Sequence, residues 1–507
     1  MHARGLRTLL SLLLVLALVA ACVPMPATPP PDGLSRPPQS AVKRLTILYT
    51  NDEHGWLAAE VNKDKRTTGG AAEMLGMWQT REGYTPDGPF LVLSGGDMWT
   101  GPAISTWFMG DPAVEATNRM GYRAAAVGNH EFDFGLDVLR RHAGEANFPY
   151  LAANLVVRGT SEPPDFVRPY LVTEVAGVKV GLIGLATRST PTTTNPKNVA
   201  GFDFLPYADA LARYVPQVQA AGAEVIVVLA HVCGAEMRAL APRAGQLGVH
   251  VLTAGHCHEQ IAEDAFAAGL PLIGAGQYLQ AYARLPLEVD AATGRVTAGK
   301  PEVIRNTAGP GGPTDAALAG RIAAWQAETE KALGEEIGYT KGGLAHRSTA
   351  LLNLTMDAWL QGYGAADVAM SNLGGFRQGI GPGPITLGEI VGALPFTNQI
   401  VDVAVTGAQL KANLDCCASA VAGITYRGGK LLLADGTPVD PAATYHVLIN
   451  DFMAGGGDRY LFNKQDPNPY FTTIDWRQPV VDYLKRLGTS QQDPLDSRLD
   501  TAPRTDK

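Results

Sequence analysis

Short apolar runs alternate with helical stretches between residue 44 and about residue 305. Seven runs are rich in branched residues, and each stops at a polar or glycine-rich turn: RLTILYT, FLVLSGGD, AAAVGNH, PYLAAN, VKVGLIGLAT, EVIVVLAH and HVLTAGH. Such runs are typical of strands that are buried on both faces of a sheet. The pattern therefore predicts a layered α/β domain, which we place at residues 42–305.

A long amphipathic helix is expected after the Gly-Pro cluster at residues 309–313. Residues 314–337 carry apolar side chains at helical spacing, namely Leu318, Ile322, Trp325 and Leu333. This spacing predicts one apolar stripe along a helix. We interpret residues 306–340 as a linker whose helix connects two domains.

A second α/β region follows at residues 341–490. Its signals are segments such as ITLGEIVGALPF, YHVLIN and FMAGGGD. The remaining residues, 491–507, form a polar tail that we expect to be mobile.

The first 22 residues have the layout of a secretory signal. Two arginines precede an apolar stretch at residues 9–21, which is shorter than a membrane-spanning helix needs. The stretch ends in small residues and Cys22, and this end resembles the bacterial lipoprotein box, in which the cysteine is lipidated. The alternative is a plain cleaved signal with an incidental cysteine. In both cases the mature protein is expected outside the cytoplasm, and in the first it is membrane-anchored, on the cell surface or in the periplasm.

Length and composition bear on the layout of the chain and on the class of partner that it binds. Residues 23–41 hold seven prolines and predict an extended tether. The chain of 507 residues is too long for one core, so two or more domains are expected. The net charge of -8 without basic blocks disfavours binding to a nucleic-acid backbone. No protein partner is indicated.

Four cysteines remain besides Cys22. Cys416 and Cys417 are neighbours, and we expect thiols there rather than a strained bond. Cys233 and Cys257 lie beside two histidine motifs. A disulfide between them, if those motifs meet in space, is a hypothesis.

Metal-ligating residue types stand at five predicted strand ends. They are Asp52 and His54 in TNDEHG, Asp97 in LVLSGGD, Asn129 and His130 in GNHEFD, His231 in VIVVLAH, and His256 and His258 in TAGHCH. A single histidine after a strand is usually only hydrogen-bonded. Five such motifs together predict a divalent metal site, because ligands of open α/β sheets bind at the ends of strands. Asp97 is the natural carboxylate to bridge two ions about 3.5–4 Å apart.

These motifs resemble those of the calcineurin-like metallophosphoesterases, specifically the 5′-nucleotidase family with its UDP-sugar hydrolases. LTILYTNDEHGWL is similar to the first motif of that family, apart from Tyr49, where the family more often has histidine. YRAAAVGNHEFD is similar to the second motif. The resemblance covers about residues 44–490. It implies a four-layer β-sandwich flanked by helices, with a second α/β domain joined by a long helix.

The resemblance also implies roles for the motif residues. One metal ion is held by Asp52, His54, Asp97 and His258, and the other by Asp97, Asn129, His231 and His256. His130 faces the substrate phosphate, Asp133 orients His130, and Glu131 is structural. The implied chemistry is attack of a metal-activated hydroxide on phosphorus. The motifs do not identify the metals, because Zn, Mn, Co, Fe and Ni all suit these ligands.

Residues of the second region suit a nucleoside and its phosphate. Arginine forks bind phosphates, and two phenylalanines can sandwich a flat base. SNLGGFR, LPFTN and FMAGGGD resemble segments of the same family. By that resemblance Phe396 and Phe452 clamp the base, Asp458 binds ribose, and the phosphate side is reached by Arg347, Asn372 and Arg377. Asn398 is a further candidate for substrate binding. The sequence departs from the family at Ser348, Ala350, Leu352 and Leu373.

We therefore expect an exported two-metal phosphohydrolase that cleaves the phosphate ester of nucleotides, with UDP-sugar or nucleotide pyrophosphate hydrolysis as further activities. One alternative is a 2′,3′-cyclic nucleotide phosphodiesterase with 3′-nucleotidase activity, and another is a sulfur-ester hydrolase of the thiosulfohydrolase type. A non-catalytic nucleotide-binding lipoprotein is the third alternative. Lost catalysis should show as a missing ligand or a missing His130, and neither is missing.

Overall fold

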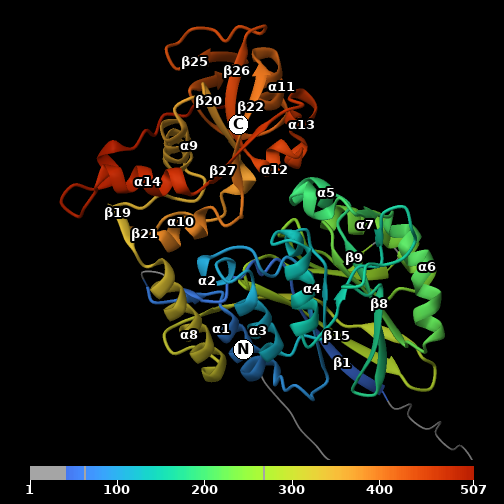
Figure 1. Ribbon diagram of the computed structural model, residues 1–507. Coiled ribbons are helices and arrows are strands. Elements are labelled where there is room, and N and C mark those ends of the chain that lie inside the picture. Colours follow the sequence, from blue (N-terminus) through green and yellow to red (C-terminus); the bar gives the residue numbers. More distant parts are fainter. Residues whose placement is uncertain (1–41, 62–63, 267–268, 507) are drawn as a thin grey trace, which may run out of the picture. The chain divides into compact units, whose positions relative to one another are not determined.

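A computed structural model describes residues 42–61, 64–266 and 269–506 (Figure 1). The predicted signal peptide, the lipidation site Cys22 and the tether lie outside these residues. Within the described part of the chain, no helix has both the length and the apolar character needed to cross a membrane. The described residues form a mixed α/β structure, as the strand pattern predicts.

Two sheets build the first part of the structure. The first has the strand order β16 (Val296–Ala298), β15 (Ala281–Asp290), β1 (Val42–Thr50), β4 (Phe90–Ser94), β5 (Ala124–Ala126) and β6 (Tyr150–Leu151), with β17 (Glu302–Arg305) also paired to β15. The second has the order β13 (Gln260–Phe266), β14 (Leu270–Ala275), β12 (Val251–Thr253), β11 (Val225–His231), β9 (Val178–Ala186) and β8 (Tyr170–Val175). Strands β1, β4, β5 and β6 run parallel, as do β9, β11, β12 and β14.

Helices cover the outer faces of both sheets. Strand residues of the two sheets share one buried cluster, which includes Ile47, Leu182 and Val227 and joins the sheets face to face. Helices α6 (Tyr207–Ala220) and α7 (Gly234–Leu247) pack against the second sheet. The first sheet is covered by α1 (Ala71–Met77), α3 (Asp111–Met120) and α4 (Leu136–Glu145). The predicted four-layer order is therefore confirmed.

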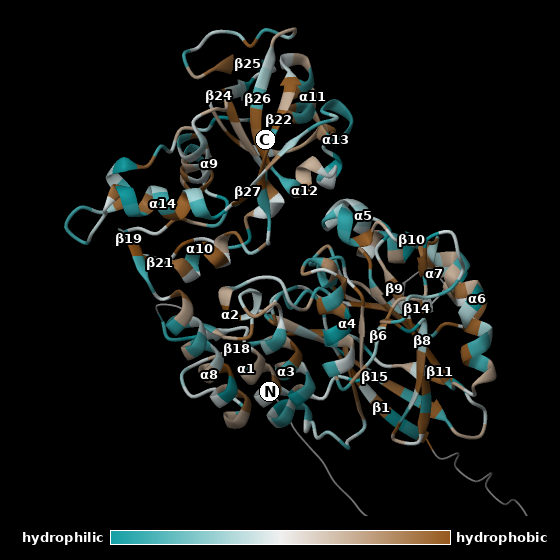
Figure 2. Cartoon of the chain, viewed as in Figure 1, coloured by the Kyte–Doolittle hydropathy of each residue, from teal (hydrophilic) through white to brown (hydrophobic). Residues whose placement is uncertain are grey.

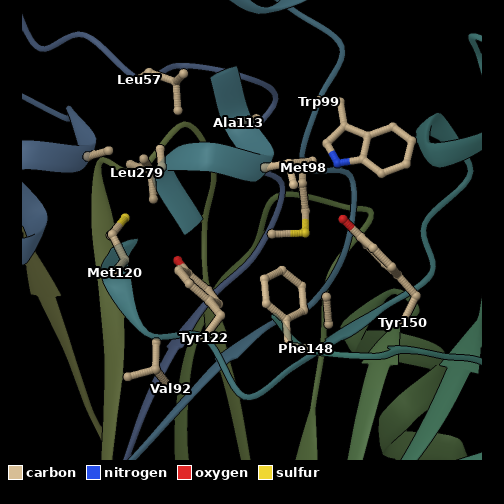
Figure 3. Packing of buried hydrophobic residues seen from close by; sticks show 14 of the residues in the cluster. Leu57, Val92, Met98, Trp99, Ala113, Met120, Tyr122, Phe148, Tyr150 and Leu279 are labelled. Atoms are coloured by element: carbon tan, nitrogen blue, oxygen red, sulfur yellow. The ribbon is translucent and has the colours of Figure 1, made fainter. Parts of the chain in front are cut away.

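Large side chains fill the layer between the first sheet and its helices. Figure 3 shows Trp99, Tyr122, Phe148 and Tyr150 packed with Met98, and all five are buried. In Figure 2 the strands are largely brown, whereas the outer helices such as α6 show hydrophilic segments in teal. The alternation of apolar strands with amphipathic helices therefore produces one core on each outer face of the paired sheets, in addition to the core between them.

The predicted long helix is present as α8 (Ala316–Leu333). The Asp315 carboxylate caps its start by accepting a hydrogen bond from the Leu318 backbone N–H at 2.9 Å. The helix packs against α3, where Glu115 accepts hydrogen bonds from Arg321 and Trp325. This helix leads from the first sheets into the second α/β region.

The second region is built around one mixed sheet. Its strand order is β23 (Ser419–Ala422), β20 (Val368–Asn372), β26 (Thr444–Asn450), β22 (Gln399–Thr406) and β27 (Tyr470–Asp475). Its helices include α9 (Thr349–Tyr363), α10 (Leu387–Ala393), α11 (Gly407–Cys416), α12 (Asp451–Ala454) and α14 (Gln478–Leu487), and β19 (Glu336–Thr340) pairs with β21 (Gly383–Thr386). All four residues that depart from the family pattern are structural here: Ser348 caps α9, and Ala350, Leu352 and Leu373 pack against the core.

The C-terminal tail is held against this region. The Asn353 side chain donates to the carbonyls of Asp500 and Ala502, both at 3.0 Å. The Arg504 guanidinium binds the Asp357 carboxylate through two hydrogen bonds of 2.7 and 2.8 Å. The expectation of a mobile tail was wrong, because a polar composition does not reveal partners that lie far away in the sequence.

Both cysteine pairs form disulfides. The hypothesis of a Cys233–Cys257 bond is confirmed. The expectation of thiols at Cys416 and Cys417 was wrong, because these neighbours are bonded across α-carbons 3.8 Å apart. The bond forms where α11 ends and the chain becomes extended at Cys417, with φ −140° and ψ 133°.

Candidate metal centre and substrate pocket

The predicted ligands gather at one edge of the paired sheets. Potential ligand atoms lie within 4.8 Å of one another in three overlapping groups: Asp52, His54 and His258; His54, Asp97 and His130; and Asp97, His231 and His256. These side chains follow parallel strands or end one, so strand direction brings them to the same edge. The Asn129 amide oxygen joins them, 3.3 Å from His231 Nε2.

Asp97 lies between the ligand groups. Its Oδ2 is 3.0 Å from His231 Nε2 and 3.9 Å from His54 Nε2. Its Oδ1 accepts a hydrogen bond from the His130 backbone N–H at 2.8 Å. This position suits a carboxylate that bridges two cations.

Two of the histidines are oriented by backbone carbonyls. His231 Nδ1 lies 2.8 Å from the Gly95 carbonyl, and His54 Nδ1 lies 2.9 Å from the Thr100 carbonyl. A carbonyl only accepts, so each Nδ1 carries the proton. Each Nε2 is then the nitrogen left to bind a metal ion, and both lie near Asp97 Oδ2.

Asp52 provides the test of fit for a metal ion. Its carboxylate is fully buried, and Oδ1 has no hydrogen-bond partner among the described residues. His258 Nε2 is 3.3 Å from that oxygen. The other oxygen accepts hydrogen bonds from Asn51 Nδ2 and from the His256 backbone N–H. A buried carboxylate oxygen without a donor is costly, and a divalent cation would satisfy it. The residues therefore fit a metal centre, although they do not identify the metal.

Five of the seven predicted ligands have left-handed backbone. The φ values are 53° at Asp52, 48° at His54, 58° at Asp97, 69° at His256 and 56° at His258. Such values are uncommon outside glycine, and they gather at sites where the surrounding structure imposes them for function. The residue types at these positions do not indicate such strain.

Glu131 supports the loop that carries Asp97. Its buried carboxylate accepts hydrogen bonds from the backbone N–H groups of Asp97, Met98 and Gly128 at 2.9, 2.7 and 2.6 Å. A β-carbon on Gly128 would lie 2.1 Å from Asp97 Oδ1, so only glycine fits there. The expected structural role of Glu131 agrees with these contacts.

His130 lies at the opening of the metal centre. Its Nδ1 is 2.7 Å from Asp133 Oδ2, and its ring stacks on Phe396 with centroids 5.7 Å apart. Burial alone would lower the pKa of the imidazole, but the carboxylates of Asp133 and Asp97 raise it above its ordinary value. The arrangement favours a positively charged imidazole that faces the adjoining cavity.

A cavity of about 440 Å³ adjoins the metal centre. It is lined by residues of the metal centre, including Asp97, Asn129, His130, Asp133, His256 and His258. It is also lined by six of the seven residues predicted to bind substrate: Asn372, Arg377, Phe396, Asn398, Phe452 and Asp458. Residues separated by more than two hundred positions in the chain thus form one pocket.

Arg377 connects the two sides of this pocket. Its Nη2 is 3.2 Å from His54 Nε2, so the guanidinium reaches the metal centre. Asp458 is held by Asn372, whose Nδ2 donates to Oδ2 at 2.7 Å. Burial raises the pKa of Asp458, and this hydrogen bond opposes the rise. A β-carbon on Gly457 would lie 2.3 Å from the Phe452 ring, so glycine permits that close approach.

Arg347 is not among the residues that line the cavity. Its Nε donates to the Phe376 carbonyl at 3.4 Å, and its backbone is left-handed with φ 53°. Burial, and then the neighbouring Arg377, lower the pKa of Arg347.

Sequence reasoning missed one wall of the pocket. This wall is formed by Phe134 and Gly135 and by four polar residues, Thr193, Thr194, Asn195 and Asn198. The polar residues lie in the segment TPTTTNPKN. A cluster of Thr, Asn and Pro is typical of a loop, and it carries no further signal of function.

Comparison with known proteins identifies what this chain resembles. Residues 329–464 match the model of the 5′-nucleotidase C-terminal domain. Among curated relatives, Endonuclease YhcR of Bacillus subtilis is 27% identical over 81% of this chain and 37% of its own length. Cell wall protein Lmo0130 of Listeria monocytogenes is 25% identical over 92% of this chain and 70% of its own length. The chain therefore spans little more than a third of the endonuclease.

A solved structure extends the likeness over both regions. The 5′-nucleotidase precursor from Thermus thermophilus superposes with a TM-score of 0.78 at 26% identity, covering 91% of this chain and 99% of that one. A further relative, from Vibrio cholerae, carries the name 5′-nucleotidase. The predicted resemblance and the two-domain metallophosphoesterase architecture are thereby confirmed.

Proposed function

We propose that this chain, a phosphoester hydrolase related to the 5′-nucleotidases, hydrolyses the phosphate ester of nucleotides. One observation carries the proposal. A single cavity of about 440 Å³ is lined both by the metal-ligand candidates and by the aromatic and carboxylate side chains suited to a nucleoside. A bound nucleotide would therefore have its phosphate beside the metal centre.

Two divalent metal ions are proposed to complete the site. The first would be held by Asp52, His54, Asp97 and His258, and the second by Asp97, Asn129, His231 and His256. When bound, such ions neutralise phosphoryl oxygens and lower the pKa of a coordinated water. The buried Asp52 oxygen without a donor and the oriented histidines support this assignment.

His130 is proposed to stabilise charge on the reacting phosphate. Its Nδ1 is committed to Asp133, so Nε2 is the nitrogen left to donate towards the cavity. A positively charged donor at a preorganised position stabilises negative charge that develops in a transition state. Arg377 would add a second cation on the same side.

The nucleoside is proposed to bind beside the residues of the second region that line the cavity. Phe396 and Phe452 would stack on the base, and Asp458, fixed by Asn372, would accept the ribose hydroxyls. Asn398 also lines the cavity and would contact polar groups of the substrate. Arg347, which does not line the cavity, would add positive charge beside Arg377.

Export, anchoring and domain division belong to the same proposal. The layout of residues 1–22 supports secretion with lipidation at Cys22, and the resemblance to a cell wall protein supports export. We place the metal domain at residues 42–305 and the nucleotide domain at residues 341–490, joined by residues 306–340. Hydrolysis of UDP-sugars or nucleotide pyrophosphates is a further proposed activity.

Phosphate release from a substrate panel tests the function. The protein is stripped of metals and then supplied with Mn²⁺, Co²⁺ or Zn²⁺. The panel holds AMP, ATP, UDP-glucose, 2′,3′-cyclic AMP and a simple aryl phosphate. Metal-dependent release from AMP, well above the aryl phosphate, is expected. Release from the aryl phosphate alone would refute the nucleoside site, and preference for the cyclic nucleotide would favour the phosphodiesterase alternative.

Two variants sharpen this experiment. His130→Asn should lose most turnover while nucleotide binding is kept. His446→Asn is the matched control, because His446 is half-exposed and pairs with Asp402, and neither residue lines the cavity. Equal activity in both variants would contradict the role given to His130.

A further inference from the structure

The segment at residues 189–198 contacts the metal centre and the loop that carries His130 and Asp133. It follows β9 and contains the short helix α5 (Thr190–Thr193) and all but the last residue of η3 (Pro196–Val199). Its contacts are Ser189 Oγ at 3.3 Å from His256 Nε2, the Thr193 carbonyl accepting from Asn129 at 3.0 Å, and Asn198 donating to the Phe132 carbonyl at 2.7 Å. The segment is therefore fixed against the metal centre at several points.

One hydroxyl of this segment is directed at the acid that pairs with His130. Thr194 Oγ1 donates to Asp133 Oδ1 at 3.0 Å, while Asp133 Oδ2 is 2.7 Å from His130 Nδ1. Thr194 is 2% exposed and lines the cavity. Each carboxylate oxygen thus has its own partner, and the plane of the carboxylate is fixed.

The neighbouring threonines do not make an equivalent contact. The hydroxyls of Thr192 and Thr193 both donate to the Ser189 carbonyl, within their own turn. Asn195 instead reaches across to the second region, where its Nδ2 donates to Asp451 Oδ2 at 3.2 Å. Asp451 directly precedes Phe452, one of the two proposed base-stacking residues. The segment that holds Asp133 is thus tied to the nucleoside side of the pocket.

We propose that Thr194 is a positioning residue, which orients His130 through Asp133. This inference rests on the proposed phosphohydrolase function. Without the hydroxyl, Asp133 Oδ1 loses its donor and the carboxylate is free to rotate. The imidazole then lies less often in the orientation that stabilises the reacting phosphate. The aromatic and carboxylate groups that hold the nucleoside are unchanged, so turnover should fall without a matching change in substrate binding.

The test compares variants that differ in one hydroxyl. Thr194→Val removes the donor at nearly constant shape, and Thr194→Ser restores it. Thr192→Val is the matched control, because it removes a hydroxyl from the same segment. For AMP hydrolysis, kcat of Thr194→Val should fall about tenfold with KM nearly unchanged, as expected for the loss of one hydrogen bond to a charged group. Thr194→Ser should recover most of kcat, and Thr192→Val should match the wild type.

Several outcomes would overturn the proposal. They are an unchanged kcat in Thr194→Val, a loss that serine does not restore, or an equal loss in Thr192→Val. Thr194→Ala, which adds no bulk, replaces valine if that variant does not fold. Crystal structures give a readout independent of turnover: the Asp133 carboxylate should rotate in Thr194→Val but not in Thr192→Val. Absence of hydrolysis by the wild type would refute the proposed function instead, while the crystal comparison would still decide the role of Thr194.

Discussion

The Cys233–Cys257 disulfide should be a major contributor to the stability of the metal domain. It joins the start of α7, two residues after His231, to the loop between His256 and His258. The perturbation is the double variant Cys233→Ala/Cys257→Ala. Alanine is chosen because Cys233 is the N-cap of α7, where serine would add a hydrogen bond of its own.

The length of the closed loop sets the expected loss. The cysteines are 24 residues apart, and a loop of that length restricts the unfolded chain by about 3.5 kcal/mol at 25 °C. This is a large share of the roughly 5–15 kcal/mol by which domains are stable. The second disulfide provides the matched control. Cys416 and Cys417 are adjacent, so their bond encloses no further residue, and Cys416→Ala/Cys417→Ala should lose only about 1 kcal/mol or less.

Urea unfolding of the metal-free proteins measures both losses. The two double variants and the wild type are compared without reductant, and the midpoint and slope of each transition give the free energy of unfolding. The Cys233/Cys257 variant should be less stable than the Cys416/Cys417 variant by about 2–3 kcal/mol. An equal loss in both variants, or no loss in the first, would refute the reasoning from loop length.

Three further predictions concern single side chains. Phe452→Ala should raise KM for AMP about tenfold in steady-state assays with kcat nearly unchanged, because one stacking face for the base is lost; an unchanged KM would contradict base stacking. Arg504→Ala should destabilise the protein by about 1–3 kcal/mol in thermal unfolding, because the partly buried bond to Asp357 is lost, whereas Arg498→Ala, in an exposed pair, should change little. Glu131→Ala should weaken Mn²⁺ binding at least about tenfold in calorimetry, because three backbone donors beside Asp97 lose their acceptor. An unchanged affinity for Mn²⁺ would contradict the role of Glu131 in supporting the Asp97 loop.

The metal-ligand candidates could be predicted because their signal is local. Each stands at or shortly after the end of an apolar run, as His231 does after VIVVLA. Parallel strands then carry such residues to one edge without any knowledge of distant contacts. Helix α8 (Ala316–Leu333) could also be predicted, because its apolar side chains recur at helical spacing over several turns.

Contacts between distant segments could not be predicted in the same way. TPTTTN presents three consecutive threonines, and no pattern shows that only the hydroxyl of Thr194 reaches Asp133. The docked tail depends on the side chains of Asn353 and Arg504, whose partners are more than a hundred residues away. The left-handed backbone at Asp97, which lies close against Gly128, likewise cannot be inferred from the residue type itself.

The most direct test of a two-metal nucleotide hydrolase is a metal titration of the stripped protein. Bound Mn²⁺ and phosphate release from AMP are measured in the same samples. We predict that activity is absent without metal and reaches its maximum only when two ions are bound per chain. Full activity in the presence of a strong chelator, or a maximum reached with fewer than two ions bound per chain, would contradict the proposed site.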